Sequence, residues 1–142
     1  MTSILVKSFY NRSSNAIVTC CRTSWIRHAH DVPSYSFKVQ DPEDFNERVL
    51  NSKVPVIVDF HATWCQPCKL LAPRIESVVD EKRGKILLAK VDIDEMTDTA
   101  LDYDVSAVPV LLAFQNGKPG DRIIGLQDED KLRTFINKFI GE

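Results

Sequence analysis

Two cysteines separated by two residues, Cys65 and Cys68, have the types and spacing best suited to chemistry in this sequence. They follow an apolar run at 54–60 and precede an amphipathic segment, so we predict a buried strand that delivers both thiols to the first turn of a helix. A helix N-terminus carries unpaired N–H groups and partial positive charge, which favour a thiolate over a thiol. We therefore expect Cys65 to have a lowered pKa and to be nucleophilic, with Cys68 near enough to form a disulfide with it.

A C-x-x-C pair could instead be half of a zinc site or a structural disulfide. A zinc site needs a second pair of Cys or His ligands at suitable spacing. The only other cysteines, Cys20 and Cys21, are adjacent and lie in a segment that we expect to be removed. This favours redox chemistry over metal binding, and we predict no bound metal or cofactor. Pro67 fits the first turn of the helix, where its missing N–H is not needed.

The composition is that of an ordinary globular protein. With 142 residues, 44% hydrophobic and 27% charged, the chain can form one domain with a substantial core. A net charge of -2 indicates no general affinity for nucleic acid. The sequence has no apolar stretch near the roughly 20 residues that span a bilayer, so we predict no transmembrane segment.

The first 30 residues differ from the rest. They contain four Lys and Arg and no Asp or Glu, whereas the remainder holds 14 basic (18 minus 4) and 20 acidic side chains. A basic, acid-free, serine-rich start is typical of a mitochondrial transit peptide, and Arg12 to Asn15 interrupt the apolar run that a secretory signal needs. We predict a leader at 1–33 and a folded domain at 34–142; the alternative is a basic disordered tail that stays attached.

The domain alternates strand and helix signals. The Asn116-Gly117 turn predicts an antiparallel final hairpin, Pro73 predicts a kink in the second helix, and Asp128 and Gly141 bound the last helix. Strands are expected at 35–39, 54–60, 86–91, 110–114 and 121–124, and helices at 42–50, 65–82, 97–103 and 128–140.

Asp59 is the one acid in an otherwise apolar strand. Its desolvation would cost several kcal/mol unless it is protonated or paired, so its pKa should rise. We favour a buried functional acid over a solvated strand end. Lys90 is either a solvated edge charge or a partner of Asp59 on a neighbouring strand, and the residues alone do not choose. Nor do they decide whether the Val108-Pro109 bond is cis or trans.

From residue 34 to 142 the chain resembles the thioredoxin family. The likeness implies an α/β thioredoxin fold, with a central mixed β-sheet flanked by helices on both faces. It rests on the order and spacing of several motifs: Val58-Asp59-Phe60, Trp64-Cys65-Gln66-Pro67-Cys68-Lys69, Pro73, Lys90-Val91-Asp92, Val108-Pro109, Asn116-Gly117 and Gly125.

The resemblance also implies a role for each matching residue. Cys65 is similar to the family's attacking cysteine and Cys68 to its resolving cysteine, and Asp59 is similar to the buried acid that helps to deprotonate the latter. Lys90 corresponds to the neighbour of that acid. The substrate-facing positions are Pro109 as a cis-proline opposite the disulfide, Val108 as a source of backbone hydrogen bonds, and Trp64 and Gly125 at the rim of the docking surface.

These roles imply a monomeric protein disulfide reductase, regenerated with electrons from NADPH by thioredoxin reductase, with peroxiredoxins among its clients. The basic leader and His61 are similar to the animal mitochondrial branch, which implies the mitochondrial matrix. The alternatives are an oxidase or isomerase with the same fold, and a module that binds partners without turnover.

Two residues depart from the usual family pattern. Gln66 stands where glycine commonly precedes the proline, and Val110 stands where threonine commonly follows the cis-proline. Residues between the cysteines tune the reduction potential, and about 30 mV corresponds to roughly 1.4 kcal/mol for a two-electron couple.

Overall fold

The computed structural model describes residues 34–142, so the predicted leader lies outside the described residues. Within this part, five strands form one sheet in the order β1-β3-β2-β4-β5. β1, β3 and β2 are parallel to one another, β4 is antiparallel to β2, and β5 is antiparallel to β4, which confirms a mixed sheet. The strands are β1 Ser36–Lys38, β2 Val56–His61, β3 Leu87–Asp92, β4 Val110–Gln115 and β5 Lys118–Ile124.

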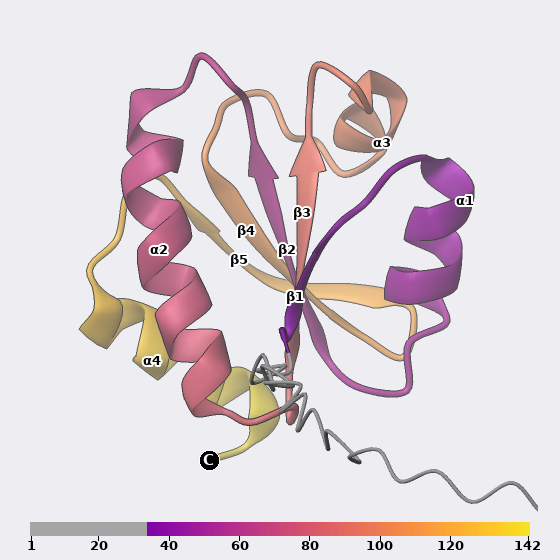
Figure 1. The fold of residues 1–142 in the computed structure, drawn as a ribbon. Coiled ribbons are helices and arrows are strands. Elements are labelled where there is room, and N and C mark those ends of the chain that lie inside the picture. Colours follow the sequence, from indigo (N-terminus) through magenta and orange to yellow (C-terminus); the bar gives the residue numbers. More distant parts are fainter. Residues whose placement is uncertain (1–33) are drawn as a thin grey trace, which may run out of the picture. The chain divides into compact units, whose positions relative to one another are not determined.

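Helices cover both faces of the sheet, as the resemblance implied. In Figure 1, α2 and α4 lie on one side of the sheet and α1 and α3 on the other. Among residues 34–142, no helix has the length and apolar character needed to cross a bilayer. The helical segments are α1 Pro42–Phe45, the π-helix η1 Asn46–Leu50, α2 Gln66–Glu81, α3 Thr97–Asp102 and α4 Glu129–Ile140.

The continuous apolar character of β2 follows from this layered packing. Side chains alternate between the two faces of a strand. Val58 and Phe60 belong to the hydrophobic cluster that includes residues of α1 and α3, whereas Ile57 belongs to the cluster formed with α2 and α4. Because both faces are covered, every residue from Val56 to Phe60 is buried. Asp59 shares the face of Ile57, and its carboxyl therefore points toward the helix that carries the cysteines.

The predicted bounds of the first helix, 42–50, are confirmed, but the segment is one α-helical turn that continues as a π-helix, in which Asn51 N–H donates to the Asn46 carbonyl. Other predicted boundaries were wrong. β5 begins at Lys118 and not at 121, because the two-residue turn lets Gln115 pair with Lys118 at once. Pro119 is tolerated there since β5 is an edge strand. Pro73 does lie inside α2, but the kink stays a prediction.

Gly117 in the β4–β5 turn should not tolerate a side chain. Its φ is +73°, and a Cβ atom there would lie 2.9 Å from the backbone carbonyl oxygen of Leu50. Gly117→Ala is therefore expected to lower the free energy of unfolding by about 2 kcal/mol or more, measured by urea denaturation. Gly141 is the matched control, because its φ is +76° with no atom within 4 Å. Equal losses for Gly117→Ala and Gly141→Ala would show that the contact with Leu50 costs nothing.

Candidate active site

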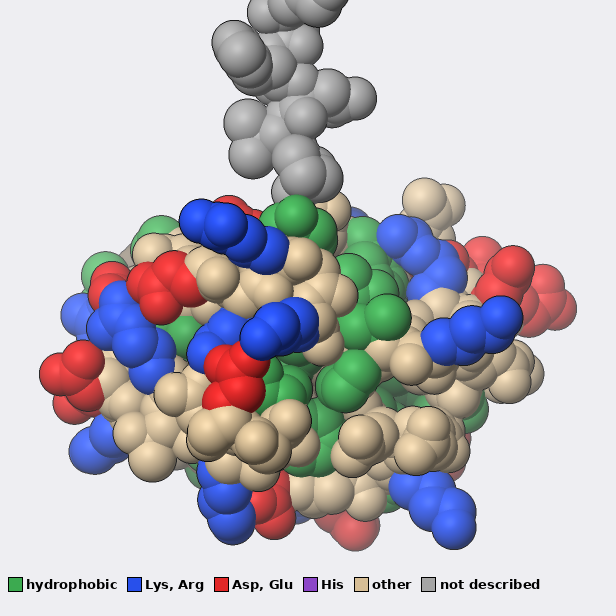
Figure 2. Space-filling view, turned by 90° about the horizontal axis from the view of Figure 1, so that it is seen from below, with side chains coloured by type: hydrophobic (Ala, Val, Ile, Leu, Met, Phe, Trp, Pro, Cys, Tyr) green, Lys and Arg blue, Asp and Glu red, His purple; other side chains and the backbone are tan. Residues whose placement is uncertain are grey.

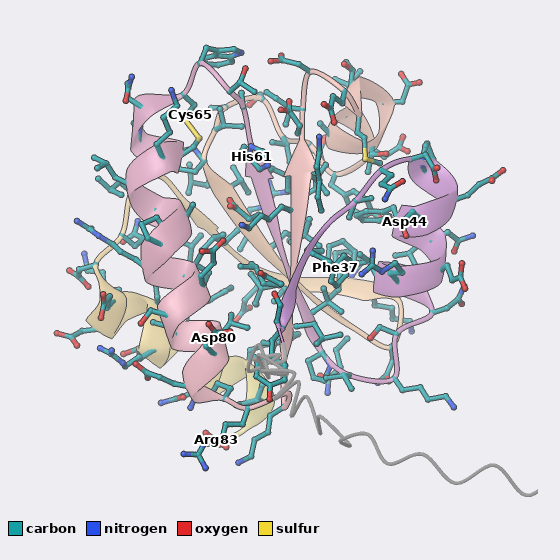
Figure 3. All side chains as sticks on the ribbon, viewed as in Figure 1. Phe37, Asp44, His61, Cys65, Asp80 and Arg83 are labelled. Atoms are coloured by element: carbon teal, nitrogen blue, oxygen red, sulfur yellow. A yellow bond between two sulfur atoms is a disulfide. The ribbon has the colours of Figure 1, made fainter. Side chains whose placement is uncertain are left out.

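The strand β2 and the helix α2 bring the two cysteines together at one end of the sheet. A three-residue loop follows His61, and Cys65 is the N-cap of α2. The Cys65 and Cys68 sulfur atoms form a disulfide, with the two Cα atoms 5.3 Å apart. Figure 3 shows this bond beside the first turn of α2, at the same end of the molecule as His61. The prediction that Cys68 can form a disulfide with Cys65 is confirmed.

The surroundings of Cys65 favour negative charge on its sulfur. Its Sγ accepts a hydrogen bond from the Cys68 N–H at 3.2 Å, in the manner of a helix N-cap. Pro67 occupies the first turn, as predicted. Both cysteines are buried and pack with Ala62 and Val108. When the disulfide is reduced, the same N–H and the helix N-terminus would stabilise a Cys65 thiolate.

Asp59 is a buried acid, as the apolar run predicted. Only 2% of its surface is exposed, and its Oδ1 has no hydrogen-bond partner among the described residues. Loss of solvation raises the pKa of this carboxyl to about 7; the positive charge of Lys90 opposes the rise and the negative charge of Glu76 adds to it. The carboxyl can therefore exchange a proton near neutral pH.

Lys90 lies beside Asp59 on the neighbouring strand, as one of its two predicted alternatives stated, and its positive charge acts on Asp59. Its ammonium group, however, forms an ion pair with Glu76 of α2. Sequence reasoning missed Glu76. A signal was available, because Cys68, Ala72 and Glu76 are spaced four residues apart and so share one face of α2.

A cavity of about 220 Å³ joins the buried acid to the second cysteine. This volume can hold several water molecules. Burial lowers the pKa of the half-buried His61 imidazole, which also lines the cavity. Among residues 34–142, no three His, Cys, Asp or Glu side chains lie together as a metal site would require. The cavity is lined by Asp59, His61, Ala62, Thr63, Cys68, Lys69, Ala72 and Lys90.

On the other side of the disulfide, the segment before β4 meets the end of β5. The Val108-Pro109 peptide bond is cis, which the residues alone could not decide. The Pro109 carbonyl accepts a hydrogen bond from the Gly125 N–H at 2.8 Å, and Val108 packs against the cysteine cluster. The structure therefore brings Val108, Pro109 and Gly125 together beside the disulfide.

Exposed residues next to the disulfide include Trp64, Gln66 and Pro67. Trp64 is 65% exposed, and its indole N–H donates to the Asp94 carboxylate at 2.9 Å. Asp94 is a second residue that sequence reasoning missed. It follows β3, whose end lies beside that of β2 because the two strands are parallel, so an acid there is well placed to reach the loop before α2.

Comparison with known proteins identifies the family. The family model described as Thioredoxin matches residues 36–138. The chain belongs to the thioredoxin family. It is a thiol-disulfide oxidoreductase, and Cys65 and Cys68 are its redox-active pair.

Individual thioredoxins support this assignment. "Thioredoxin, mitochondrial" of Rattus norvegicus is 54% identical over 114 residues, which cover 80% of this chain and 69% of that protein. "Probable thioredoxin-2" of Caenorhabditis elegans is 42% identical over 137 residues, or 94% of each chain. A solved mutant thioredoxin from Halobacterium salinarum NRC-1 is 33% identical, with a TM-score of 0.68 over 76% of this chain and 93% of its own.

Proposed function

We propose that the chain reduces disulfides of client proteins, with Cys65 as the attacking and Cys68 as the resolving cysteine. The Cys65 thiolate attacks one client sulfur, a mixed disulfide forms, and the other client sulfur leaves as a thiolate. Cys68 then attacks the Cys65 sulfur, which releases the second client sulfur and leaves the disulfide seen in the structure. Two electrons pass to the client. The observation that carries this proposal is the pair at the start of α2, with a buried acid behind it.

Asp59 would be the base that removes the proton from the Cys68 thiol. Both residues line the same cavity, and burial raises the pKa of Asp59 to about 7, so the carboxyl can take up a proton near neutral pH. Water in the cavity would then carry the proton to solvent. Lys90, which forms an ion pair with Glu76, would lower this pKa without contacting the sulfur.

The face beside the disulfide would dock the client chain. Exposed Trp64, Gln66 and Pro67 border one side, and Gly125 borders the other. Backbone groups of Val108, next to the cis Pro109, would pair with an extended client segment. The reacting client sulfur would thus be held over Cys65.

The disulfide left after each cycle must be reduced again. Since the reaction uses only the two cysteines, it requires no bound cofactor, and we assign the electrons to NADPH by way of thioredoxin reductase. Peroxiredoxins and other disulfide-containing proteins would be clients of a monomeric enzyme. At the end of the described domain opposite the disulfide, Figure 2 shows basic side chains beside acidic ones, and Lys82 and Lys85 pair with Glu142. Such a mixture of charges does not favour a polyanion.

We assign the protein to the mitochondrial matrix, with residues 1–33 as its transit peptide. Two observations support this assignment. The first 30 residues are basic and contain no acid. The rat relative carries the name "Thioredoxin, mitochondrial".

The decisive experiment combines insulin reduction with trapping of the intermediate. The wild type should catalyse insulin reduction with dithiothreitol, and Cys68→Ser should accumulate disulfide-linked client adducts because the resolving thiol is gone. Repeating the trap with Cys20 and Cys21 also changed to Ser controls for adducts in the leader. The proposal fails if the wild type shows no turnover and no adducts form. Redox titration against glutathione separates a reductase from an oxidase.

A further inference from the structure

Two exposed apolar side chains lie at the end of β5 and on the loop that joins it to α4. Ile124 is 61% exposed and Leu126 is 40% exposed. Between them, Gly125 donates its N–H to the Pro109 carbonyl, which places this loop beside the segment that packs on the disulfide. The short run Ile124–Gln127, here called the rim loop, therefore presents apolar surface next to the redox centre.

A single arginine ties the far end of this loop to the cysteine-bearing helix. Arg74 of α2 donates from Nη1 to the Gln127 carbonyl at 2.9 Å, across 53 residues of sequence. The Gln127 side-chain amide donates to the Ile124 carbonyl at 3.1 Å, which closes the loop on itself. The rim loop is thus fixed at Gly125 by Pro109 and at Gln127 by Arg74.

The bond from Arg74 is well suited to hold a backbone segment. A charged donor makes a stronger hydrogen bond than a neutral one, and both Arg74 and Gln127 are partly shielded from water. Arg74 lies six residues after Cys68 in the same helix, so the loop and the disulfide are both attached to α2. A loop that is already ordered loses less conformational entropy when a client binds.

We propose that Arg74 is a positioning residue for client proteins, which holds the rim loop in register with the cysteines. It contacts neither sulfur nor client. The inference rests on the proposed reductase function, and it assigns to Arg74 an effect on the binding of folded or extended protein clients only. A small disulfide that needs no rim loop should react independently of Arg74.

The test compares Arg74→Ala with the wild type on a protein and on a small disulfide. We expect the KM for insulin to rise about tenfold, equivalent to about 1.4 kcal/mol, with kcat and the rate with 5,5'-dithiobis(2-nitrobenzoate) unchanged. Arg74→Lys keeps a charged donor and should recover part of the loss. Lys53→Ala is the charge control, because it removes one positive charge before β2, at the end opposite the disulfide.

A second readout does not depend on turnover. In Arg74→Ala, hydrogen exchange of the Gly125 N–H should accelerate about tenfold, while amides in the centre of β2 keep their wild-type rates. The proposal would be overturned if Arg74→Ala and the wild type had the same kinetic constants on both substrates and the same exchange rate at Gly125. It would also be overturned if Arg74→Ala lost as much activity on the small disulfide as on insulin. If the wild type itself reduces no insulin, the reductase function fails, but the exchange result still decides whether Arg74 holds the loop.

Discussion

Cys65→Ser is expected to lower the rate of insulin reduction by three orders of magnitude or more, to about the uncatalysed level. Serine retains the size of the side chain but not the easily ionised sulfur, so the N–H of Cys68 and the N-terminus of α2 have no thiolate to stabilise. The loss is measured in the insulin assay, and single-turnover release of a coloured thiol from a small aromatic disulfide, followed by stopped-flow, reports the first attack by itself.

Cys68→Ser is the matched control for this prediction. It should still carry out the first attack, because Cys65 keeps its position at the N-cap of α2. It should nevertheless stop after one event, since no second thiol resolves the mixed disulfide. A Cys68→Ser variant that is silent in single turnover, beside an active Cys65→Ser, would reverse the two roles that we assign.

Asp59→Asn should make the oxidised protein more resistant to urea relative to the wild type at high pH than at low pH. Folding raises the pKa of Asp59 from 3.8 to about 7 because burial removes its solvation. The folded wild type therefore binds a proton more tightly, so the stability linked to this group is full below pH 3.8 and is lost as pH rises through 7. The shift corresponds to about 4 kcal/mol.

The quantity to measure is the difference in unfolding free energy between Asp59→Asn and the wild type, at about pH 3 and at about pH 8.5. This difference should shift by about 4 kcal/mol in favour of the variant. Comparing this difference at the two pH values cancels the free-energy cost of burying an amide, because that cost does not depend on pH. Asp92→Asn is the control for placing an amide at a buried site, because Asp92 is also buried and its Oδ1 accepts the Asp94 N–H, a bond that an amide oxygen can keep.

The same variant should separate the two steps of the proposed reaction. Attack by Cys65 should keep its rate, whereas resolution by Cys68 should slow about 100-fold near pH 7, because a general base contributes at least this factor. Unchanged resolution, or a pH-independent stability difference, would remove Asp59 from the mechanism. If Asp59 is the titrating group, the same substitution should change both the pH dependence of stability and the rate of resolution by Cys68.

Local patterns determined the parts of this protein whose residues are close in sequence. The disulfide could be predicted from three local features: the apolar run before Cys65, the position of Cys65 at a helix start, and its spacing from Cys68. A helix turn brings residues at this spacing together. The buried state of Asp59 followed in the same way from its apolar neighbours. The Asn116-Gly117 turn predicted the antiparallel hairpin.

Only the tertiary structure decided the contacts between distant residues. Lys90 and Glu76 are separated by 14 positions, Trp64 and Asp94 by 30, and Arg74 and Gln127 by 53. Such pairs depend on which strands are neighbours and which helix packs on them, and the hydrophobic period of a segment carries no such information. The residues alone also left open the state of the Val108-Pro109 bond, which is cis in the structure, since an isolated X-Pro bond differs little in energy between its two forms.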